Sequence, residues 1–465
     1  MVTKLTKNGY IIRKSDYTPK EIKEIKDELF VKPYIFNKNV NKDSGFHIYM
    51  ESPKKLYLPR FYGEKKYGIS TINNIEEGDN IDIQFKGDLR EEQKPIEEIY
   101  LKNAYEKGGG IISIRCGGGK TVLALHIASI LRKKTVVVVH KDFLMTQWRD
   151  RILEFLPGAR IGKIQQNTID IEDKDIVLAM VQSLSMKEYE EGIFNTFGLA
   201  IFDECHHLGA EVFFRSMGKV ASKYMLGLSA TPKRKDGLSK VFEWYIGDIV
   251  YLQKKKNEDY AEVQLIDCNF NNEQYNKEEI NFRKEPCMPK MINNICNFLP
   301  RTELIVELIL KYNKEGRNVL ILSDRRGHLE CMYNLLEGKS RGYYVGGMKP
   351  DQLRESQEKD ILLATFSMAA EGMDIPKLDT VILSSPKSDV EQSIGRIFRK
   401  KASDRQFHPL IIDLQDNFSM FQKQCGKRLL LYRKMNFSIF HNGEEIKKKP
   451  RGKKIKIDKF SLIED

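Results

Sequence analysis

The sequence is poor in the features that mark secreted and membrane proteins. Its seven cysteines are odd in number and include no CxxC pair, which excludes a disulfide-stapled scaffold and favours a reducing, intracellular compartment. No apolar run approaches the roughly 20 residues that span a bilayer, and the longest, such as residues 135–139, have the length of a strand. The opening MVTKLTKNGYIIRKSD has no apolar signal core, so we expect neither secretion nor a membrane partner.

The composition is that of a globular protein with a polyanionic partner. Hydrophobic residues make up 41% and charged residues 31% of the 465 residues, and a chain of this length predicts two or three domains. The excess of 77 Lys and Arg over 65 Asp and Glu gives a net charge of +12. This charge suits nucleic acid, although lysine-rich surfaces often serve only solubility.

From residue 89 onward the chain repeats one unit: an apolar strand, a polar or glycine-rich turn and an amphipathic helix. Continuous Val, Ile and Leu runs predict strands buried on both faces of a parallel sheet, so we expect two α/β, doubly wound sheets. The strands predicted for the first sheet are 111–115, 135–140, 175–180, 199–204 and 225–230, and those for the second are 318–323, 342–347, 360–365, 380–385 and 409–414.

The remaining segments complete the expected domain organisation. Residues 1–88 mix short β-rich runs (FHIYM, KLYLPRFYG, IDIQF) with a Lys-rich helix over 19–29, which predicts a small α+β N-terminal appendage. The other domains are a first lobe (89–255), a second lobe (256–430) and a basic C-terminal tail (431–465), with the charged stretch 251–301 as the connection between the lobes. The run from Lys447 to Lys459 suits either electrostatic capture of nucleic acid or a solubilising or import tail.

The segment IISIRCGGGKT, residues 111–121, has the composition of a phosphate-binding loop. Glycines let backbone N–H groups approach phosphate oxygens, and the helix that follows adds its N-terminal partial charge. Lys120 is then placed to reach the β- and γ-phosphates and Thr121 to ligate Mg²⁺. Ile114 stands where the strict pattern has glycine, which leaves an ordinary glycine-rich turn as the alternative. The residues expected to contact the nucleotide here are Cys116, Gly117, Gly118, Gly119, Lys120 and Thr121.

The segment LAIFDECHH, residues 199–207, is an apolar strand that ends in two acids. Such strand ends face the ligand crevice of a doubly wound sheet, so we expect Asp203 in the Mg²⁺ shell and Glu204 to activate the attacking water. An N-capping acid pair is one alternative. A zinc site at residues 205–207 is another, but consecutive ligands converge poorly on one metal. His206 suits a coupling residue between the lobes or a satisfied polar histidine.

The order of the motifs IRCGGGKT, DECHH, SATPKRKDG, ATFSMAAEGMDIP and QSIGRIFRK resembles superfamily 2 helicases of the DExH type. Within these, the chain is most similar to the branch that contains the eukaryotic repair and transcription helicase XPB, the phage helicase UvsW and the poxvirus transcript-release helicase. The likeness runs from about residue 89 to 425, and the cysteine of the loop and the departure at Ile114 match that branch. It implies two RecA-like lobes, ATP and Mg²⁺ as cofactors, and DNA rather than RNA as partner, alongside replication, repair or transcription proteins.

The same resemblance implies roles for single residues of the first lobe. Gln93, with Arg90 nearby, is similar to the glutamine that contacts adenine, and an exposed polar pair on a helix is the alternative. In HKDFLMTQW the residues that resemble nucleic-acid contacts are Lys141, Gln147 and Trp148, and Trp148 equally suits the core. The residues Ser229, Ala230 and Thr231 resemble the motif that couples hydrolysis to strand movement.

In the second lobe, Thr365 resembles a nucleic-acid backbone contact, and Gly372 and Asp374 resemble a nucleotide-facing segment. The spacing of the residues Gln392, Gly395, Arg396 and Arg399 predicts one face of a helix. Arginines on that face would neutralise the transferring phosphoryl group, whereas the alternative is a surface helix with solvated arginines.

These features predict an ATP-driven DNA helicase or translocase that acts on duplex or branched DNA. The alternatives are an RNA helicase or transcript-release ATPase, and a motor subunit that moves on duplex DNA without unwinding it. Abundant Lys, Ile and Asn, together with the branch resemblance, point to a large DNA virus or an AT-rich genome as the source.

Overall fold

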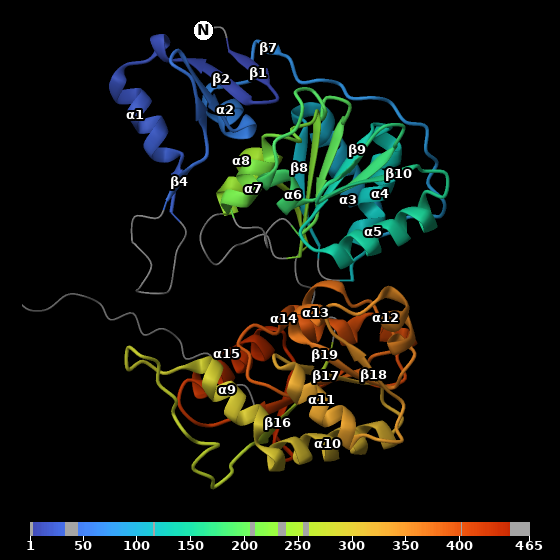
Figure 1. Cartoon of the computed structure of the whole chain (residues 1–465). Helices are drawn as coiled ribbons and strands as arrows, with labels where there is room; N and C mark the ends of the chain where they lie inside the picture. Colours follow the sequence, from blue (N-terminus) through green and yellow to red (C-terminus); the bar gives the residue numbers. More distant parts are fainter. Residues whose placement is uncertain are drawn as a thin grey trace, which may run out of the picture. The chain divides into compact units, whose positions relative to one another are not determined.

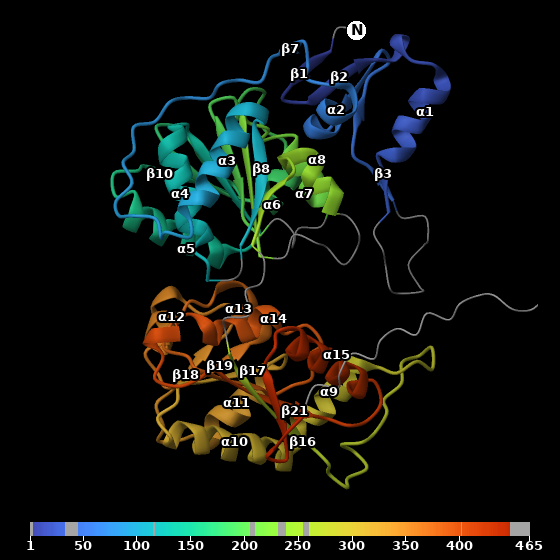
Figure 2. The same ribbon diagram turned by 180° about the vertical axis from the view of Figure 1, so that it is seen from behind.

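The computed structural model describes residues 3–32, 45–114, 117–204, 210–230, 239–253, 260–400 and 402–446. The chain divides into two compact units, 1–255 and 256–465, and each is drawn in Figures 1 and 2. Within the described residues, no helix is both long and apolar enough to cross a bilayer.

The N-terminal part of the first unit is a small α+β domain, as the sequence predicts. Its sheet has the order β5-β6-β2-β1-β7, and alternating burial along β2 is the pattern of a strand with one face on the core. Helix α1 starts with a capping box, in which Thr18 and Glu21 exchange side-chain and backbone hydrogen bonds. The elements are β1 Lys4–Thr6, β2 Gly9–Arg13, α1 Pro19–Glu28, β3 Phe30–Val31, β4 Phe46–His47, β5 Met50–Glu51, β6 Lys55–Leu58, α2 Arg60–Tyr67 and β7 Ile72–Asn73.

The strand expected over residues 81–85 is absent, and the prediction is wrong. Asn80, which precedes this segment, makes an isolated bridge with Lys133, and the segment buries Ile81 and Ile83 in the core of the neighbouring large sheet. Its alternating pattern arises from lying along a surface rather than from pairing in a sheet. The segment before residue 88 therefore already belongs to the packing of the next domain.

The large sheet of the first unit is doubly wound, with the order β11-β10-β12-β9-β13-β14-β8-β15. All its pairs are parallel except β10 with β11. The five predicted strands are confirmed, and the sequence missed β10, β11 and β15. The strands are β8 Gly109–Ser113, β9 Thr135–Val139, β10 Ile161–Gln165, β11 Thr168–Asp170, β12 Ile176–Met180, β13 Leu199–Phe202, β14 Tyr224–Ser229 and β15 Ile249–Leu252.

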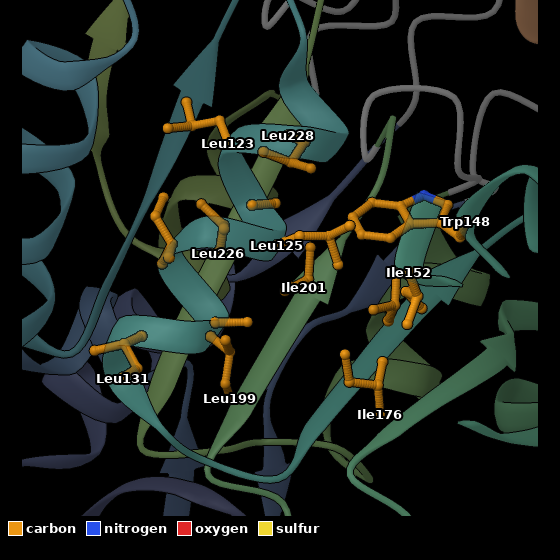
Figure 3. Packing of buried hydrophobic residues seen from close by; sticks show 14 of the residues in the cluster. Leu123, Leu125, Leu131, Trp148, Ile152, Ile176, Leu199, Ile201, Leu226 and Leu228 are labelled. Atoms are coloured by element: carbon orange, nitrogen blue, oxygen red, sulfur yellow. The ribbon is translucent and has the colours of Figure 1, made fainter. Parts of the chain in front are cut away.

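Helices cover both faces of this sheet, and each face has its own apolar cluster. Side chains of α3, α4 and α5 pack on one face, and Figure 3 shows those of α4 and α5. Side chains of α6, α7 and α8 contribute to the cluster on the other face. The helices are α3 Lys94–Lys107, α4 Lys120–Leu131, α5 Asp142–Phe155, α6 Val181–Met186, α7 Ala210–Met217 and α8 Ser239–Ile246.

The N-terminal domain is fixed to the large sheet through α2 and α8. The Tyr62 and Trp244 rings meet edge to face at 5.3 Å, and the Tyr245 hydroxyl donates to the Ile48 carbonyl at 2.7 Å. Arg60 donates to the Lys223 carbonyl at 3.0 Å. The two domains thus share one apolar cluster and form a single unit.

The second unit holds another doubly wound sheet, with the order β18-β19-β17-β20-β21-β16-β22-β23. The five strands predicted for it are confirmed. Its strands are β16 Glu262–Asp267, β17 Val319–Ser323, β18 Arg341–Tyr344, β19 Ile361–Thr365, β20 Thr380–Leu383, β21 Leu410–Gln415, β22 Ser438–His441 and β23 Glu444–Glu445, and its helices are α9 Met288–Asn297, α10 Leu299–Lys314, α11 Arg326–Leu335, α12 Pro350–Gln357, α13 Phe366–Gly372, α14 Glu391–Ile394 and α15 Phe421–Lys434.

Two expectations for this unit need correction. Residues 251–301 are not merely a connection, because β16 pairs in parallel with both β21 and β22. Residues 431–446 are not tail, because they complete α15 and supply β22 and β23. The run from Lys447 to Lys459 lies outside the described residues.

Candidate active site

The glycine-rich loop lies between buried strand β8 and helix α4, which begins at Lys120. Gly117 and Gly119 have φ of 80° and 74°, a left-handed region that glycine adopts without strain. A Cβ on Gly119 would stand 2.5 Å from Nε2 of Gln93. The loop therefore presents backbone N–H groups and a helix N-terminus, the arrangement that binds phosphate. Cys116 lies outside the described residues.

Gln93 braces this loop. Its Nε2 donates to the carbonyls of Gly118 at 3.2 Å and Gly119 at 3.1 Å, and its Oε1 accepts from the Arg90 backbone N–H at 3.0 Å. The alternative of an exposed pair is wrong for Gln93, which is buried, and holds for Arg90, which is exposed. The adenine contact stays a prediction, and the loop contact is a role that the sequence did not reveal.

Lys120 and Glu204 meet at the centre of the site. The Lys120 ammonium lies 2.5 Å from Oε1 of Glu204, and the backbone N–H of Ala230 donates to Oε2 of the same carboxylate at 3.3 Å. Glu204 has φ of 46°, which costs a non-glycine residue about 1 kcal/mol or more and is common at functional sites. One carboxylate thus links the phosphate loop to the end of β14.

Trp148 contacts the Asp203 carboxylate from the side of the core. The indole Nε1 donates to Oδ2 of Asp203 at 2.8 Å, and Figure 3 shows Trp148 among the side chains of the core. Burial raises the pKa of Asp203, and the neighbouring Glu204 raises it further, against the opposing effects of Lys120, the indole hydrogen bond and His140. The site therefore favours a positive charge beside this carboxylate.

The prediction that Trp148 contacts nucleic acid is wrong. The side chain is 1% exposed and belongs to the core cluster. Leu144, Trp148 and Ile152 recur every four residues along α5, so they share the face that packs on the sheet. That spacing was the pattern in the sequence that could have placed the ring inside. Lys141, the N-cap residue of α5, and Gln147 are half-buried, and their contact with nucleic acid stays a prediction.

Ser229 ends β14 directly beside the strand that leads into the glycine loop. It pairs in register with Ser113 of β8, and its carbonyl accepts from the Ile114 N–H at 3.0 Å. The coupling residues His206 and Thr231 lie outside the described residues.

The first unit offers oxygen ligands that fit Mg²⁺. Thr121 stands in the first turn of α4, and Asp203 is a buried carboxylate that burial and Glu204 disfavour as an anion. A hydroxyl and a carboxylate are hard donors of the kind that Mg²⁺ prefers. Within the described ranges no group of three or more His, Cys, Asp or Glu could hold a metal, and the zinc alternative at residues 205–207 lies outside them.

In the second unit, the predicted residues gather around α13. Thr365 precedes α13 as its N-cap residue, with its hydroxyl 3.3 Å from that of Ser367, and Gly372 ends the helix. Asp374 follows and lies 3.5 Å from the Arg399 guanidinium. The structure thus brings the second-lobe residues of the two last motifs together.

The segment 391–399 is not one continuous α-helix, although Arg396 and Arg399 both donate to the Met373 carbonyl and so lie on the same side, as predicted. Helix α14 has four residues and continues as a 3₁₀ turn over Gly395–Phe398. The number of residues per turn therefore changes from 3.6 to 3.0. Gln392, in α14, is half-buried.

The two arginines of this segment have different environments. Arg396 is buried, and its guanidinium donates to the carbonyls of Ala369, Ala370 and Met373 at the end of α13. Arg399 makes one long contact, 3.4 Å to the Met373 carbonyl, besides its pair with Asp374. The solvated-arginine alternative is wrong for Arg396, which caps a helix.

A buried network that no sequence motif predicts positions the loop before this segment. Arg301 donates to the Ser384 carbonyl at 2.7 Å, and Arg428 donates to the Lys387 carbonyl at 2.8 Å. Both arginines are also paired with buried aspartates. No sequence pattern marks them, since arginines on helices are usually exposed.

Comparison with known proteins gives concordant likenesses. Residues 86–234 match the family described as "Type III restriction enzyme, res subunit", and residues 300–401 match "Helicase conserved C-terminal domain". The "Putative ATP-dependent RNA helicase L396" of Acanthamoeba polyphaga mimivirus is 36% identical over 462 residues, which cover 96% of this chain and 88% of the relative.

Two further likenesses are more distant. The "Putative helicase 161L" of Invertebrate iridescent virus 6 is 27% identical and covers 76% of this chain and 83% of its own length. The solved structure of T4 UvsW aligns over 91% of this chain and 96% of its own, with 18% identity and a TM-score of 0.36.

Proposed function

We propose that this chain, which belongs to the superfamily 2 helicases, couples its nucleic-acid-dependent ATP hydrolysis to movement along duplex or branched DNA. The observation that carries the proposal is the Glu204 carboxylate, which lies 2.5 Å from the Lys120 ammonium and accepts from the Ala230 N–H. These three groups belong to the phosphate loop, the acid pair and the coupling motif.

The contact between Lys120 and Glu204 explains how ATP would start the cycle. Phosphate oxygens in the glycine loop compete for the Lys120 ammonium, because a triphosphate carries more negative charge than one carboxylate. Glu204 then gives up the Lys120 contact and can orient and deprotonate a water. Its hydrogen bond from Ala230 would transmit the change to the segment that follows β14.

Asp203 and Thr121 would hold Mg²⁺, which when bound would neutralise negative charge on the phosphates. Trp148 fixes the orientation of the Asp203 carboxylate from inside the core. Gln93 engages the loop carbonyls of Gly118 and Gly119, which would leave the N–H groups of the loop to bind phosphate.

In the second lobe, we propose that Arg399 contacts the transferring phosphoryl group and that Arg396 supports the end of α13. Arg396 is fully engaged with the carbonyls that end α13. Arg399 has a more exposed partner, Asp374, whose side chain is 44% exposed. The Arg399 side chain is 15% exposed and its contact with Asp374 is long, at 3.5 Å, so we assign Arg399 to exchange Asp374 for a phosphate.

DNA is favoured by the likeness of the RCGGGKT loop to the XPB and UvsW branch. RNA is the second candidate, because the mimivirus relative is named a putative RNA helicase. Backbone contacts from Lys141, Gln147 and Thr365 would suit either strand unless a 2′-hydroxyl is recognised. We expect binding to be independent of sequence and to weaken steeply with salt.

The test is an ATPase and strand-displacement assay on forked DNA, duplex DNA, single-stranded DNA and matched RNA, with the Lys120→Ala variant alongside. We expect DNA to stimulate wild-type ATPase more than RNA, and Lys120→Ala to abolish turnover while retaining nucleic-acid binding. Lys163→Ala, at an exposed position on β10, is the matched control. Stronger stimulation by RNA would transfer the proposal to RNA. Hydrolysis on duplex DNA without strand release would identify a translocase that does not unwind.

A further inference from the structure

The second unit carries a long loop between β16 and α9, residues 268–287, which Figure 1 shows ahead of α9. Its tip, Ile280–Pro286, closes on itself through an isolated antiparallel bridge between these two residues. None of the sequence motifs lies in this segment, and neither ATP hydrolysis nor the core of the sheet uses the side chains at its tip.

Hydrogen bonds close the tip into a turn. The Asn281 side-chain oxygen accepts from the Arg283 N–H at 2.8 Å and from the Glu285 N–H at 3.1 Å. The Asn281 N–H donates to the Glu285 carbonyl at 2.8 Å, and the Lys284 N–H donates to the Asn281 carbonyl at 3.0 Å. Asparagine commonly stabilises a turn in this way. Residue 282 therefore lies within this hydrogen-bonded turn.

The base of the loop is tied to the rest of the unit through its acidic residues. Glu279 accepts from Asn294 of α9 at 3.2 Å and pairs with Lys277 at 2.9 Å. Glu278 accepts from the Ser419 hydroxyl at 2.5 Å. These contacts engage the two carboxylates near the base, and the tip itself carries Arg283, Lys284 and Glu285, two cations and one anion.

At the tip, a large apolar ring projects into solvent. Phe282 is 89% exposed and Ile280 is 53% exposed. The Arg283 guanidinium lies 5.0 Å from the centre of the Phe282 ring, and Lys284 is exposed beside it. An exposed side chain of this size contributes almost no burial of apolar surface to the stability of the fold. Packing therefore does not explain why a phenylalanine stands at this turn.

We propose that the Phe282 ring stacks on an unpaired base of the nucleic-acid strand on which the chain acts, with Arg283 and Lys284 at the flanking phosphates. A flat aromatic ring bordered by cations is the combination with which proteins bind single strands without sequence preference. The net charge of +12 suits the same partner. The inference rests on the proposed nucleic-acid motor and adds a contact outside its motifs.

The experiment compares the full-length Phe282→Ala variant with the wild type on forked DNA that carries 2-aminopurine at successive positions of one single-stranded arm. Wild-type protein should change the fluorescence at one or two of these positions, and Phe282→Ala should remove that change. Affinity for the single strand should fall about tenfold, within the range measured for loss of one base–aromatic stack. ATP turnover without nucleic acid should stay unchanged.

Two variants separate stacking from a general loss of structure. Phe282→Trp should restore both the fluorescence change and the affinity, because it keeps a flat ring, and Leu430→Ala, a change at another exposed apolar residue of the same unit (65% exposed), should behave as wild type. If wild type displaces strands and Phe282→Ala matches it in affinity and fluorescence, the stacking proposal is overturned and the ring would suit a protein partner instead. If wild type neither binds nor responds to nucleic acid, the proposed function itself fails.

Discussion

The indole of Trp148 donates a 2.8 Å hydrogen bond to the carboxylate of Asp203, so a core side chain of α5 orients the acid that ends β13. Replacing Trp148 with Phe keeps a ring in the core and removes the donor. Loss of a hydrogen bond to a buried charged group costs about 1–3 kcal/mol, and each 1.4 kcal/mol corresponds to about tenfold in rate. We expect kcat for ATP to fall about tenfold.

The control for this prediction is Ile152→Val, which trims the same core face of α5 without touching Asp203. Steady-state ATPase and thermal melting of both variants would distinguish positioning from packing. An equal loss of kcat in Ile152→Val and Trp148→Phe would contradict a specific role for the indole.

Arg396 and Arg399 should respond differently to replacement by alanine. Arg396→Ala removes the guanidinium that donates to three carbonyls at the end of α13. An unsatisfied buried polar group costs about 1–3 kcal/mol, so the melting temperature should fall by several degrees. Arg399→Ala should leave the melting temperature nearly unchanged, retain ATP binding and slow hydrolysis by about a hundredfold or more. Calorimetry, nucleotide binding and single-turnover hydrolysis measure the three effects, and unchanged hydrolysis in Arg399→Ala would remove its assignment.

Arg301 and Asp416 form a buried pair with two hydrogen bonds, at 2.8 and 2.9 Å. Arg301→Leu leaves the Asp416 charge unpaired in the core, which costs about 3–5 kcal/mol. Adding Asp416→Leu should recover much of this loss, because two apolar side chains tolerate burial together. Chemical denaturation of the single and double variants forms a double-mutant cycle. Additive losses would show that the pair contributes no coupling.

His328 should make the second unit sensitive to acid. Burial, with Arg301 nearby, lowers the pKa of His328 to about 3, and its Nδ1 lies 3.2 Å from the Ser323 hydroxyl. Because the unfolded chain takes up this proton near pH 6.5 and the folded chain does not, stability is full above about pH 6.5 and declines as the pH falls toward 3.

The His328→Gln variant removes this titration and keeps a polar side chain beside Ser323. Between pH 7.5 and 5.0 it should lose about 2 kcal/mol less stability than wild type, since the slope approaches 1.4 kcal/mol per pH unit below the unfolded pKa. Denaturant titrations at the two pH values provide the comparison, and identical losses would show that His328 is accessible to protons in the folded state.

The N-terminal domain should loosen from the first unit when the Trp244 ring is removed. Trp244→Ala deletes the edge-to-face contact with Tyr62, and truncation of a large core aromatic costs about 3–5 kcal/mol when fully buried, less at this half-buried position. Hydrogen exchange in α2 should accelerate while β9 stays protected. Trp244→Phe, which keeps a ring, should retain the protection, and equal protection in Trp244→Ala would show that other contacts hold the domain.

Local patterns determined much of this protein. The ten apolar runs that predicted strands are all strands in the structure. Uninterrupted Val, Ile and Leu residues are typical of a strand whose sheet is covered by helices on both faces. The glycine loop, Lys120 and the acids at residues 203–204 were identified for the same reason: their chemistry depends on neighbours in sequence. The motif order supplied the family.

Tertiary structure decided what depends on distant partners. No local sequence pattern predicts that β16 pairs with β22. Only this pairing in the folded chain places both strands in one sheet. The burial of Trp148, the capping of α13 by Arg396 and the bracing of the glycine loop by Gln93 each require a group more than 20 residues away. A sequence lists the groups that can bind, and only the packed chain determines which of them meet, because a hydrogen bond forms within about 3 Å wherever in the sequence its partner lies.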